Sequence, residues 1–469
     1  MKKIVFYLFI VTLTLFSGCK NAFITSKKAA PPNIIIILAD DLGFHDVGFN
    51  GCEDIPTPNI DRIANEGVKF TNGYVSYTVC GPSRAGLITG RYQDRFGFGR
   101  NPLFTPKDPQ MGLPLSEETM ATALKKAGYR TMAIGKWHLG AHESLRPLNR
   151  GFDEFFGFLT GGHQYFPELL TLKDISEVKS QFDAYKTRLL HNNTRVEIKE
   201  YLTDALSAEA VHFVERNTDK PFFLYLAYNA PHTPLQATEK YLSRFSDIKN
   251  KKRRTYAAMV SALDDGVGRL LDTLESLKIA DNTIVFFLSD NGGPTNKNGS
   301  NNDPLRAGKG SMYDGGIHVP FAMRWPRVIP AGKVYEKPVI SLDIFATVAK
   351  YARAKPTHPL DGINIVPYLL GKKKGQPHDF LAWRKFDQHR YAVRSGDFKL
   401  VNEGNDELYN LTKDIGERNA LTDQTKMESL LKLKDQWTKQ MIDPVFLGLV
   451  QNALYNKLHP DRWENVEPY

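Results

Sequence analysis

Two pairs of oxygen-bearing side chains lie far apart in this 469-residue sequence, each directly after an apolar run. Asp40-Asp41 follows residues 33–39, and Asp290-Asn291 follows residues 283–288. Carboxylate and amide oxygens are the hard ligands that Ca²⁺ and Mg²⁺ prefer, whereas zinc more usually attracts His or Cys. An Asp-Asp pair alone could equally cap a helix, but a second pair at an equivalent position favours a calcium or magnesium site.

Two further apolar runs also end in residues that could do chemistry. Residues 131–134 lead into Lys136 and His138, and residues 222–228 lead into His232. Continuous β-branched and aromatic runs are typical of strands buried on both faces, as in parallel sheets. Because ligands of open α/β sheets bind beyond the carboxyl ends of the strands, we expect all four strand ends to face one site.

The segments between these runs show helical patterns. Ser116 could cap a helix that reaches Ala127 and ends at Gly128, and apolar residues recur at helical spacing over 259–274. Alternating strands and helices predict an α/β fold, with a large, mostly parallel central sheet sandwiched by helices.

The pattern changes near residue 376. Short strands are predicted at 380–383, 391–394 and 398–401, with a hairpin turn at 395–397 between the last two. A polar helix follows over about 427–441. We therefore expect a smaller C-terminal α+β domain carrying an antiparallel sheet, and an irregular tail after Asp443.

Residues 80–90 read Cys-Gly-Pro-Ser-Arg-Ala-Gly-Leu-Ile-Thr-Gly. A lone cysteine before a turn and a helix is by default a buried structural residue. This segment, however, resembles the signature Cys-x-Pro-Ser-Arg-x-x-Leu-x-Thr-Gly of the type I, formylglycine-dependent sulfatases, which have the alkaline phosphatase superfold. Similar marks of that family lie at 135–140, 231–232, 309–316, 392–400 and 408–411. The resemblance therefore extends over nearly the whole mature chain.

The resemblance implies a role for each matched position. A maturation enzyme would oxidise Cys80 to Cα-formylglycine. One calcium ion would be bound by that residue together with Asp40, Asp41, Asp290 and Asn291. The remaining roles fall on basic residues. Arg84 would hold and polarise the formylglycine, Lys136 would bridge the formylglycine and the sulfate, and His138 would act as base on the formylglycine hydrate. His232 and Lys309 would contact the sulfate ester, and one of them would protonate the leaving alcohol.

The implied chemistry is physically consistent. A hydrated aldehyde carries two hydroxyls on one carbon, so that one can attack sulfur while deprotonation of the other later expels sulfate. Sulfuryl transfer resembles phosphoryl transfer, in which catalysis depends mainly on positioning and on neutralising the equatorial oxygens. A divalent cation and three basic side chains would supply that positive field.

The composition is that of an ordinary globular protein, with 42% apolar and 24% charged residues, so disorder, collagen and coiled coil are excluded for the whole chain. The net charge of +9 is modest for this length and does not indicate nucleic acid. An export signal is predicted over residues 1–18 from Lys2-Lys3 and the apolar residues 4–16. This apolar stretch is too short to span a bilayer as a helix.

Residues 15–19 resemble a bacterial lipobox, although Phe16 is atypical, so lipidation of Cys19 and plain export are both open. We expect a periplasmic or cell-surface protein whose only membrane attachment is a lipid on Cys19. By resemblance, the sulfatase catalytic domain would cover 31–375, and the small C-terminal domain with the tail would cover 376–469.

Exported bacterial sulfatases of this kind commonly serve polysaccharide breakdown, and we favour a terminal sulfated sugar of an algal polysaccharide or its oligosaccharides over a host glycosaminoglycan. Candidate sugar-binding residues are the basic, polar and aromatic residues Arg95, Arg100, His163, Gln164, Tyr165, Trp383 and Arg384.

Two alternatives stay open. A phosphoesterase of the same superfold would usually need a Thr or Ser nucleophile and a two-zinc His/Asp set, against which Cys80 and the lack of further strand-end histidines argue. A non-catalytic, glycan-binding surface lipoprotein would result if Cys80 were never oxidised.

Overall fold

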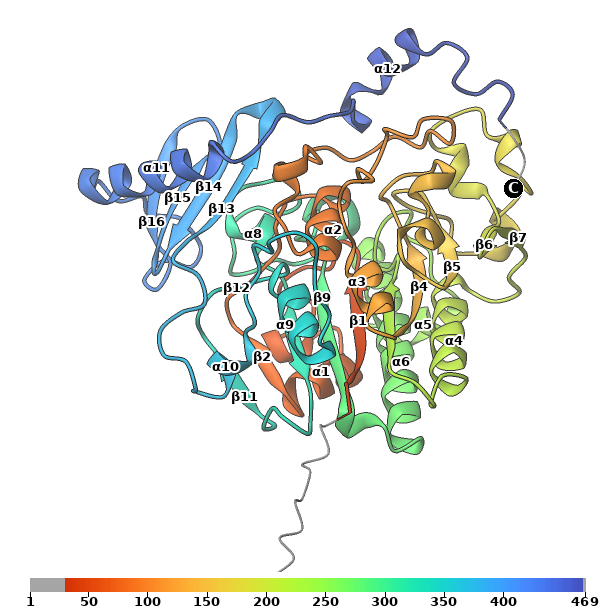
Figure 1. Cartoon of the computed structure of the whole chain (residues 1–469), viewed down its shortest axis with the longest axis horizontal. Helices are drawn as coiled ribbons and strands as arrows, with labels where there is room; N and C mark the ends of the chain where they lie inside the picture. The colour runs from red at the N-terminus through yellow and green to blue at the C-terminus, as the bar shows by residue number, and fades with distance from the viewer. Residues whose placement is uncertain (1–29, 467–469) are drawn as a thin grey trace, which may run out of the picture. The chain divides into compact units, whose positions relative to one another are not determined.

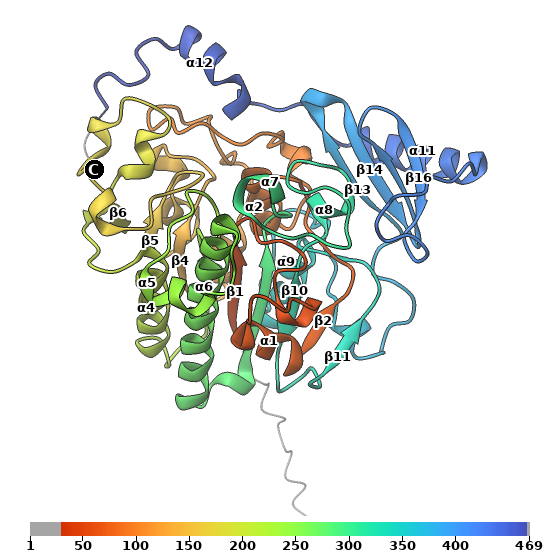
Figure 2. The same cartoon turned by 180° about the vertical axis from the view of Figure 1, so that it is seen from behind.

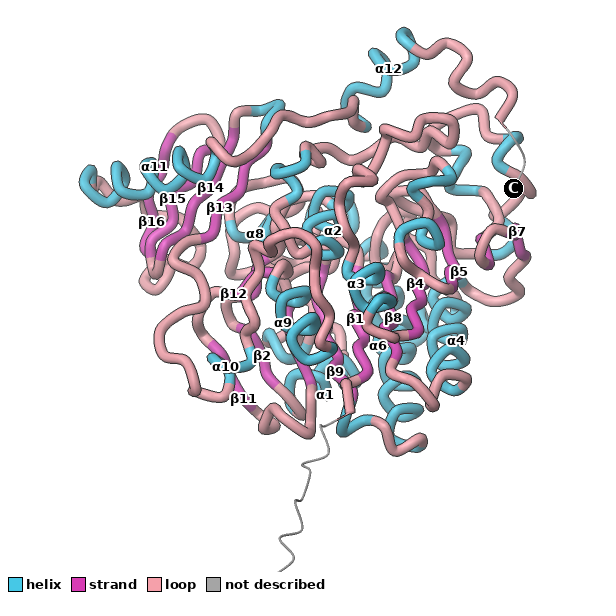
Figure 3. The backbone as a smooth tube through the Cα atoms, viewed as in Figure 1, coloured by secondary structure: helices cyan, strands magenta, loops and turns pink. Residues whose placement is uncertain are grey.

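The structure, a computed structural model, describes residues 30–466, and the chain from Pro31 onward forms one compact unit. Its main feature is a ten-stranded sheet in the order β11-β2-β10-β9-β1-β8-β4-β5-β6-β7 (Figures 1 and 3). The strands of this sheet are β1 (Asn33–Ala39), β2 (Val68–Phe70), β4 (Arg130–Lys136), β5 (Glu154–Phe158), β6 (Leu189–His191), β7 (Thr194–Val196), β8 (Phe222–Ala227), β9 (Thr283–Ser289), β10 (Phe321–Arg324) and β11 (Lys333–Tyr335).

The centre of this sheet is parallel, as its residue types predict. β1 pairs in parallel with β8 and β9, and β4 pairs in parallel with β8 and β5, whereas β10 runs antiparallel to β9. Alternate β1 residues enter different cores: Ile34 and Ile36 pack in one, Ile35 and Ile37 in the other. Because neither face of β1 meets solvent, every position can be apolar, which produces the continuous run.

Helices cover both faces of the sheet. Helices α2 (Cys80–Thr89), α3 (Met120–Lys126) and α9 (Asp343–Ala352) pack on the face seen in Figure 1. Helices α1 (Pro58–Asn65), α4 (Leu202–Glu215), α5 (Glu239–Leu242) and α6 (Lys251–Ser276) cover the opposite face, seen in Figure 2. Shorter elements complete this part: β3 (Gly73–Tyr74), β12 (Val339–Ile340), α7 (Thr295–Asn298), α8 (Asp314–Ile317) and α10 (Val366–Leu369).

A second, antiparallel sheet follows, in the order β13-β14-β15-β16. Its strands are β13 (Leu381–Lys385), β14 (Arg390–Ser395), β15 (Phe398–Asn402) and β16 (Asp406–Asn410), and α11 (Gln424–Thr438) packs against it. The predicted fold class is confirmed: a large, mostly parallel sheet lies between helices, and a smaller antiparallel sheet follows it.

One predicted helix start is wrong. The helix expected to be capped by Ser116 is α3, and its cap is Thr119, whose hydroxyl oxygen accepts a hydrogen bond from the Thr122 N–H at 3.1 Å. The same hydroxyl donates to the Arg150 carbonyl at 2.6 Å. Residues 115–117 instead form a turn and a bend before the helix.

The tail after Asp443, which the sequence left unplaced, runs back along the main body. The Val445 N–H donates to the Gly97 carbonyl at 3.0 Å, and the Leu449 N–H donates to the Asn101 carbonyl at 2.9 Å. Further on, α12 (Asn452–Leu458) follows. No helix within residues 30–466 is long and apolar enough to cross a membrane. The predicted leader and Cys19 lie outside the described residues.

Candidate active site

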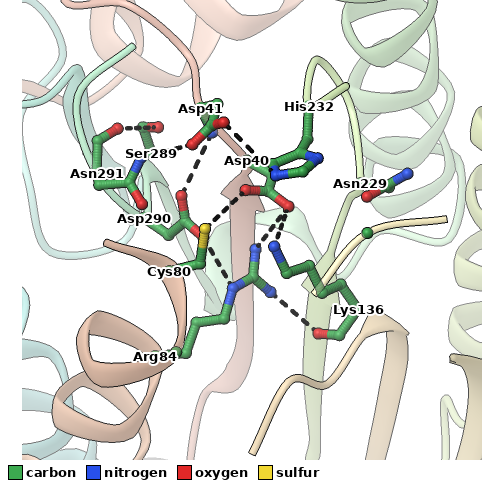
Figure 4. Close-up of polar contacts among 12 residues, drawn as sticks. Asp40, Asp41, Cys80, Arg84, Lys136, Asn229, His232, Ser289, Asp290 and Asn291 are labelled. Atoms are coloured by element: carbon green, nitrogen blue, oxygen red, sulfur yellow. Dashed lines mark hydrogen bonds and ion pairs between the residues drawn. The ribbon is translucent and has the colours of Figure 1, made fainter. Parts of the chain in front are cut away.

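The two oxygen-bearing pairs meet at the carboxyl end of the central sheet. β1 and β9 pair with Ala39 opposite Ser289, so Asp40-Asp41 and Asp290-Asn291 come level just beyond them. The Asn291 side-chain amide donates to Asp41 Oδ1 at 2.7 Å, and the Asp41 N–H donates to Asp290 Oδ1 at 3.4 Å. All four residues are buried (Figure 4).

Cys80 is the first residue of α2, a helix whose ten residues are all buried. Its thiol faces the acidic pairs, with Sγ 3.5 Å from Asp40 Oδ1 (Figure 4). Gly81 permits this placement, because a Cβ there would lie 2.9 Å from both Asn101 Oδ1 and a Pro102 carbon. The dipole at a helix N-terminus favours an anion, so the position suits a sulfate group.

Three basic side chains neutralise the three carboxylates. Lys136 Nζ donates to Asp40 Oδ2 at 2.5 Å, and Arg84 Nε donates to Asp290 Oδ2 at 2.8 Å. The third cation, Lys309, lies 2.6 Å from Asp41 Oδ1 and donates to the Cys80 sulfur at 3.0 Å. The charges of this buried group therefore balance, and a bound divalent cation would give it the net positive charge that an anionic ester requires.

The donor set fits a hard divalent cation. One ligand atom from each of Asp40, Asp41, Cys80 and Asp290 lies within 4.8 Å of the others. Asn291 Oδ1 is buried and has no hydrogen-bond partner among the described residues. A buried, unpartnered amide oxygen beside three carboxylates is the ligand chemistry of calcium or magnesium rather than of zinc. An oxidised residue 80 would add one more oxygen.

Burial and charge set the protonation of the site. Burial raises the pKa of Asp41, but the charges of Lys309 and His232 outweigh it and lower that pKa to about 2. Burial also raises the pKa of the Cys80 thiol to about 12, although Lys136 and Lys309 oppose it. Because the thiolate is the nucleophilic form of cysteine, an unmodified Cys80 is poorly suited to nucleophilic attack at neutral pH.

Two histidines complete the predicted catalytic set. His232 Nε2 lies 3.7 Å from Asp41 Oδ2, and His232 Nδ1 lies 2.6 Å from the Thr233 carbonyl oxygen. A ring nitrogen of His232 is also within 4.8 Å of the Cys80 sulfur. His138 is 6% exposed, and no hydrogen bond joins it to the acidic pairs among the described residues. Burial lowers the pKa of both histidines, that of His232 to about 3.

Comparisons with known proteins point to the same chemistry. The sequence profile of the family described as "Sulfatase" matches residues 32–354. The chain is a member of the sulfatase family. A second profile, "N-sulphoglucosamine sulphohydrolase, C-terminal", matches residues 307–443. The resemblance that rested on residues 80–90 is thereby confirmed.

Individual relatives agree with the profiles. Human N-acetylgalactosamine-6-sulfatase is 36% identical over 362 residues, which cover 74% of this chain and 67% of that protein. The uncharacterized sulfatase YdeN of Escherichia coli (strain K12) is 30% identical over 533 residues, covering 93% and 89%. The crystal structure of Ps i-CgsB in complex with k-i-k-neocarrahexaose superposes with a TM-score of 0.84 at 39% identity, covering 93% of this chain and 100% of that one. The enzyme class is therefore that of a sulfuric ester hydrolase.

Two arginines predicted to bind substrate in this sulfatase hold parts of the chain together. Arg100 donates to both carboxylate oxygens of Asp387, at 2.8 and 2.5 Å, and to the Phe446 carbonyl at 2.8 Å. Arg384 donates to Asp94 Oδ1 at 2.9 Å and also to the Ile442 carbonyl. Arg95 is likewise paired with Asp361.

The remaining sugar-binding candidates are polar or aromatic residues that lie largely inside the protein. His163, Tyr165 and Trp383 are fully buried. The Tyr165 hydroxyl lies 2.8 Å from the carbonyl oxygens of Asn229 and His232, so it holds the loop that carries His232. Gln164 Oε1 accepts from the Gln236 amide at 2.7 Å. None of these three rings is therefore exposed to a ligand at the protein surface.

The sequence reasoning missed two asparagines that shape the acidic site. Asn298 Nδ2 donates to the Asp41 carbonyl at 3.1 Å. Asn302 Oδ1 accepts from the Gly293 N–H at 3.0 Å and from the Phe44 N–H at 3.3 Å. Asparagines recur through residues 291–302, directly after Asp290, and that composition was the available signal.

Proposed function

We propose that this sulfatase hydrolyses a sulfate ester on a carbohydrate, with residue 80 oxidised to formylglycine and one calcium ion bound beside it. The observation that carries the proposal is the position of Cys80, at the N-terminus of α2 and within 4.8 Å of the ligand atoms of Asp40, Asp41 and Asp290. A thiol whose pKa burial raises to about 12 does not suit this place, whereas an aldehyde hydrate does.

The proposed cation and the oxidised side chain would each supply part of the chemistry. Asp40, Asp41, Asp290 and Asn291 would hold the cation, which supplies Lewis acidity and positive charge. The oxidised side chain at residue 80 supplies the hydroxyl nucleophile.

The protein's own residues then position and protonate. Lys136 and Lys309 project ammonium groups toward the N-terminus of α2, where the sulfate oxygens would lie. Arg84 is held by Asp290 and by the Lys136 carbonyl, at 2.8 and 3.0 Å, so its guanidinium is fixed before substrate arrives. His138 would accept a proton at residue 80, and His232 or Lys309 would donate one to the leaving alcohol.

The substrate we propose is a sulfated sugar of an algal polysaccharide or its oligosaccharides. Support for the algal polysaccharide comes from Ps i-CgsB, whose crystal structure contains k-i-k-neocarrahexaose. The N-acetylgalactosamine-6-sulfatases, whose name specifies an amino sugar, support a sulfated sugar in general. We further propose that the chain is exported by residues 1–18 and is periplasmic or anchored at the cell surface through Cys19.

The test is direct. The full chain is produced together with a formylglycine-generating maturation enzyme and digested with trypsin. The mass of the peptide containing residue 80 is then measured by mass spectrometry. We expect a loss of about 18 Da from CH₂SH to CHO. Free sulfate is then measured after incubation with sulfated oligosaccharides from carrageenan, ulvan and fucan.

Two controls keep the outcomes separate. Cys80→Ala should release no sulfate while unfolding at the wild-type temperature. A matched panel of phosphate esters tests the phosphoesterase alternative. Sulfate release by Cys80→Ala would contradict the mechanism. An unmodified thiol at residue 80 in a protein that releases sulfate would contradict it as well. Binding of the oligosaccharides without release of sulfate would favour the non-catalytic alternative.

A further inference from the structure

A small pocket adjoins the segment that leads into Cys80. It has a volume of about 170 Å³ and lies between three segments: the hairpin that joins β13 to β14, the tail near residue 450, and residues 99–101. Val79, the residue before Cys80, also lines it. Pockets for drug-sized ligands measure roughly 300–1,000 Å³, so this one is sized for a single small unit such as one sugar or its charged group.

Two hydrogen bonds fix the pocket against the catalytic residues. The Gly81 N–H donates to Asn101 Oδ1 at 2.8 Å, beside Cys80. Lys385 Nζ donates to the Gly310 carbonyl at 2.8 Å, beside Lys309. A substrate whose sulfate lies at Cys80 and Lys309 would therefore extend its neighbouring group over Lys385.

The walls of the pocket are held before any ligand arrives. Asp387 is engaged by Arg100 from one side and by the Gln451 amide at 3.0 Å from the other. Gly448 lets the tail approach, because a Cβ there would lie 2.7 Å from the Arg100 Cβ. Arg100 thus forms part of the pocket wall. Asp387, the only acidic group among the lining residues, already has two hydrogen-bond partners.

Lys385 differs from the other cations near the site. No carboxylate lies within 4.0 Å of its ammonium group among residues 30–466, and its hydrogen-bond partner is the carbonyl of Gly310. The nearby Glu403 pairs with Arg390 at 2.5 Å. Burial lowers the pKa of Lys385, although the more distant charges of Glu403 and Asp387 oppose it, so holding this charge has a net cost. An anion in the pocket would offset that cost.

The rim offers the complementary contacts for a sugar. The side chain of Gln388 is exposed, and Val450 is 92% exposed beside it in the pocket lining. An amide can hydrogen-bond hydroxyls, and an exposed apolar side chain can pack on the C–H face of a ring.

We propose that Lys385 is a specificity-determining residue that binds an anionic substituent, a sulfate or a carboxylate, on the sugar next to the one that loses its sulfate. The proposal rests on the carbohydrate sulfatase activity proposed above. Gln388 and Val450 contact the same neighbouring sugar.

The test compares Lys385→Met with the wild type on three matched oligosaccharides, each with the same cleavable sulfate. The neighbouring sugar carries a sulfate, a carboxylate or neither. A charge-assisted hydrogen bond corresponds to a change of roughly 10- to 100-fold in kcat/KM. We expect the wild type to prefer one or both anionic substrates by about that factor and Lys385→Met to lose the preference. The substrate that is preferred identifies the anion. Lys385→Arg should retain the preference, and the exposed Lys372→Met is the matched control.

Each outcome decides between roles. A merely structural role, through the Gly310 carbonyl, would lower kcat/KM on all three substrates equally and leave their ratio unchanged, which would overturn the proposal. A wild-type ratio near one would overturn it as well, while leaving the sulfatase function intact. Absence of sulfate release from every substrate by a protein with verified formylglycine would overturn the proposed carbohydrate substrate itself.

Discussion

Replacement of Lys399 by Met should destabilise the protein strongly. Lys399 lies on β15, is fully buried, and donates to Asp314 Oδ1 at 2.6 Å and to Glu417 Oε1 at 2.8 Å. Asp314 begins α8, five residues after Lys309, so this buried ion group joins the small sheet to the catalytic loop. Removal of one partner of a buried ion pair costs about 3–5 kcal/mol, because it leaves a charge without compensation.

The loss should grow with pH. Burial raises the pKa of Glu417 to about 7, although Lys399 lowers it. A carboxyl whose pKa is raised by folding stabilises the protein fully below its unfolded pKa, and that contribution is lost as pH rises toward the folded pKa. Without Lys399, the pKa of Glu417 in the folded state rises further. The variant therefore continues to lose stability above pH 7, by about 1.4 kcal/mol per pH unit, whereas the wild type loses no more stability from this group in that range.

Thermal unfolding followed by circular dichroism at pH 6 and pH 8 measures both effects. For a chain of 469 residues, about 1 kcal/mol shifts the Tm by roughly 1 °C, so we expect decreases of about 3 °C at pH 6 and about 4 °C at pH 8. The exposed Lys413→Met is the matched control and should unfold like the wild type. A Lys399→Met variant that unfolds within about 1 °C of the wild type, or equally early at both pH values, would refute the reasoning.

Three further predictions concern the site and its support. Asn291→Ala should weaken cation binding at least tenfold, measured by the Tm increase that added Ca²⁺ produces, because it removes a buried amide oxygen; an unchanged calcium titration would contradict this. Removal of the cation with EGTA should abolish sulfate release and lower the Tm, and Ca²⁺ but not buffer alone should restore both. Burial alone would lower the pKa of His378, but Asp343 outweighs it and raises that pKa, so this pair stabilises the fold at acidic pH and less as pH rises past the folded pKa. His378→Gln should flatten the dependence of Tm on pH between 6 and 9, and equal slopes for variant and wild type would exclude this role.

The central sheet could be predicted from sequence because its strands are buried on both faces. Residues 33–39 form a strand with the predicted bounds, and 283–289 exceeds its prediction by one residue. Residues that end such strands must meet at one edge, which is why the acidic pairs were found together. These inferences needed no knowledge of which helix packs where.

Side-chain partners could not be predicted in the same way. Arg384 and Arg100 have the residue type of a substrate contact, but their partners, Asp94 and Asp387, lie 290 and 287 positions away. Lys385 adjoins Arg384 in sequence, yet its side chain reaches the pocket beside Gly310. On a strand, neighbouring side chains point to opposite faces, and only the assembled fold decides which face meets the active site.

Because β1 pairs with β9, the cation site forms only when this part of the chain has folded completely. Asp41 and Asn291 are 250 residues apart and come together only when the middle of the sheet has closed. A partly folded chain holds either half of the ligand set alone, and an ion that binds both halves stabilises only the finished enzyme. The supply of that ion would then set how long each molecule survives.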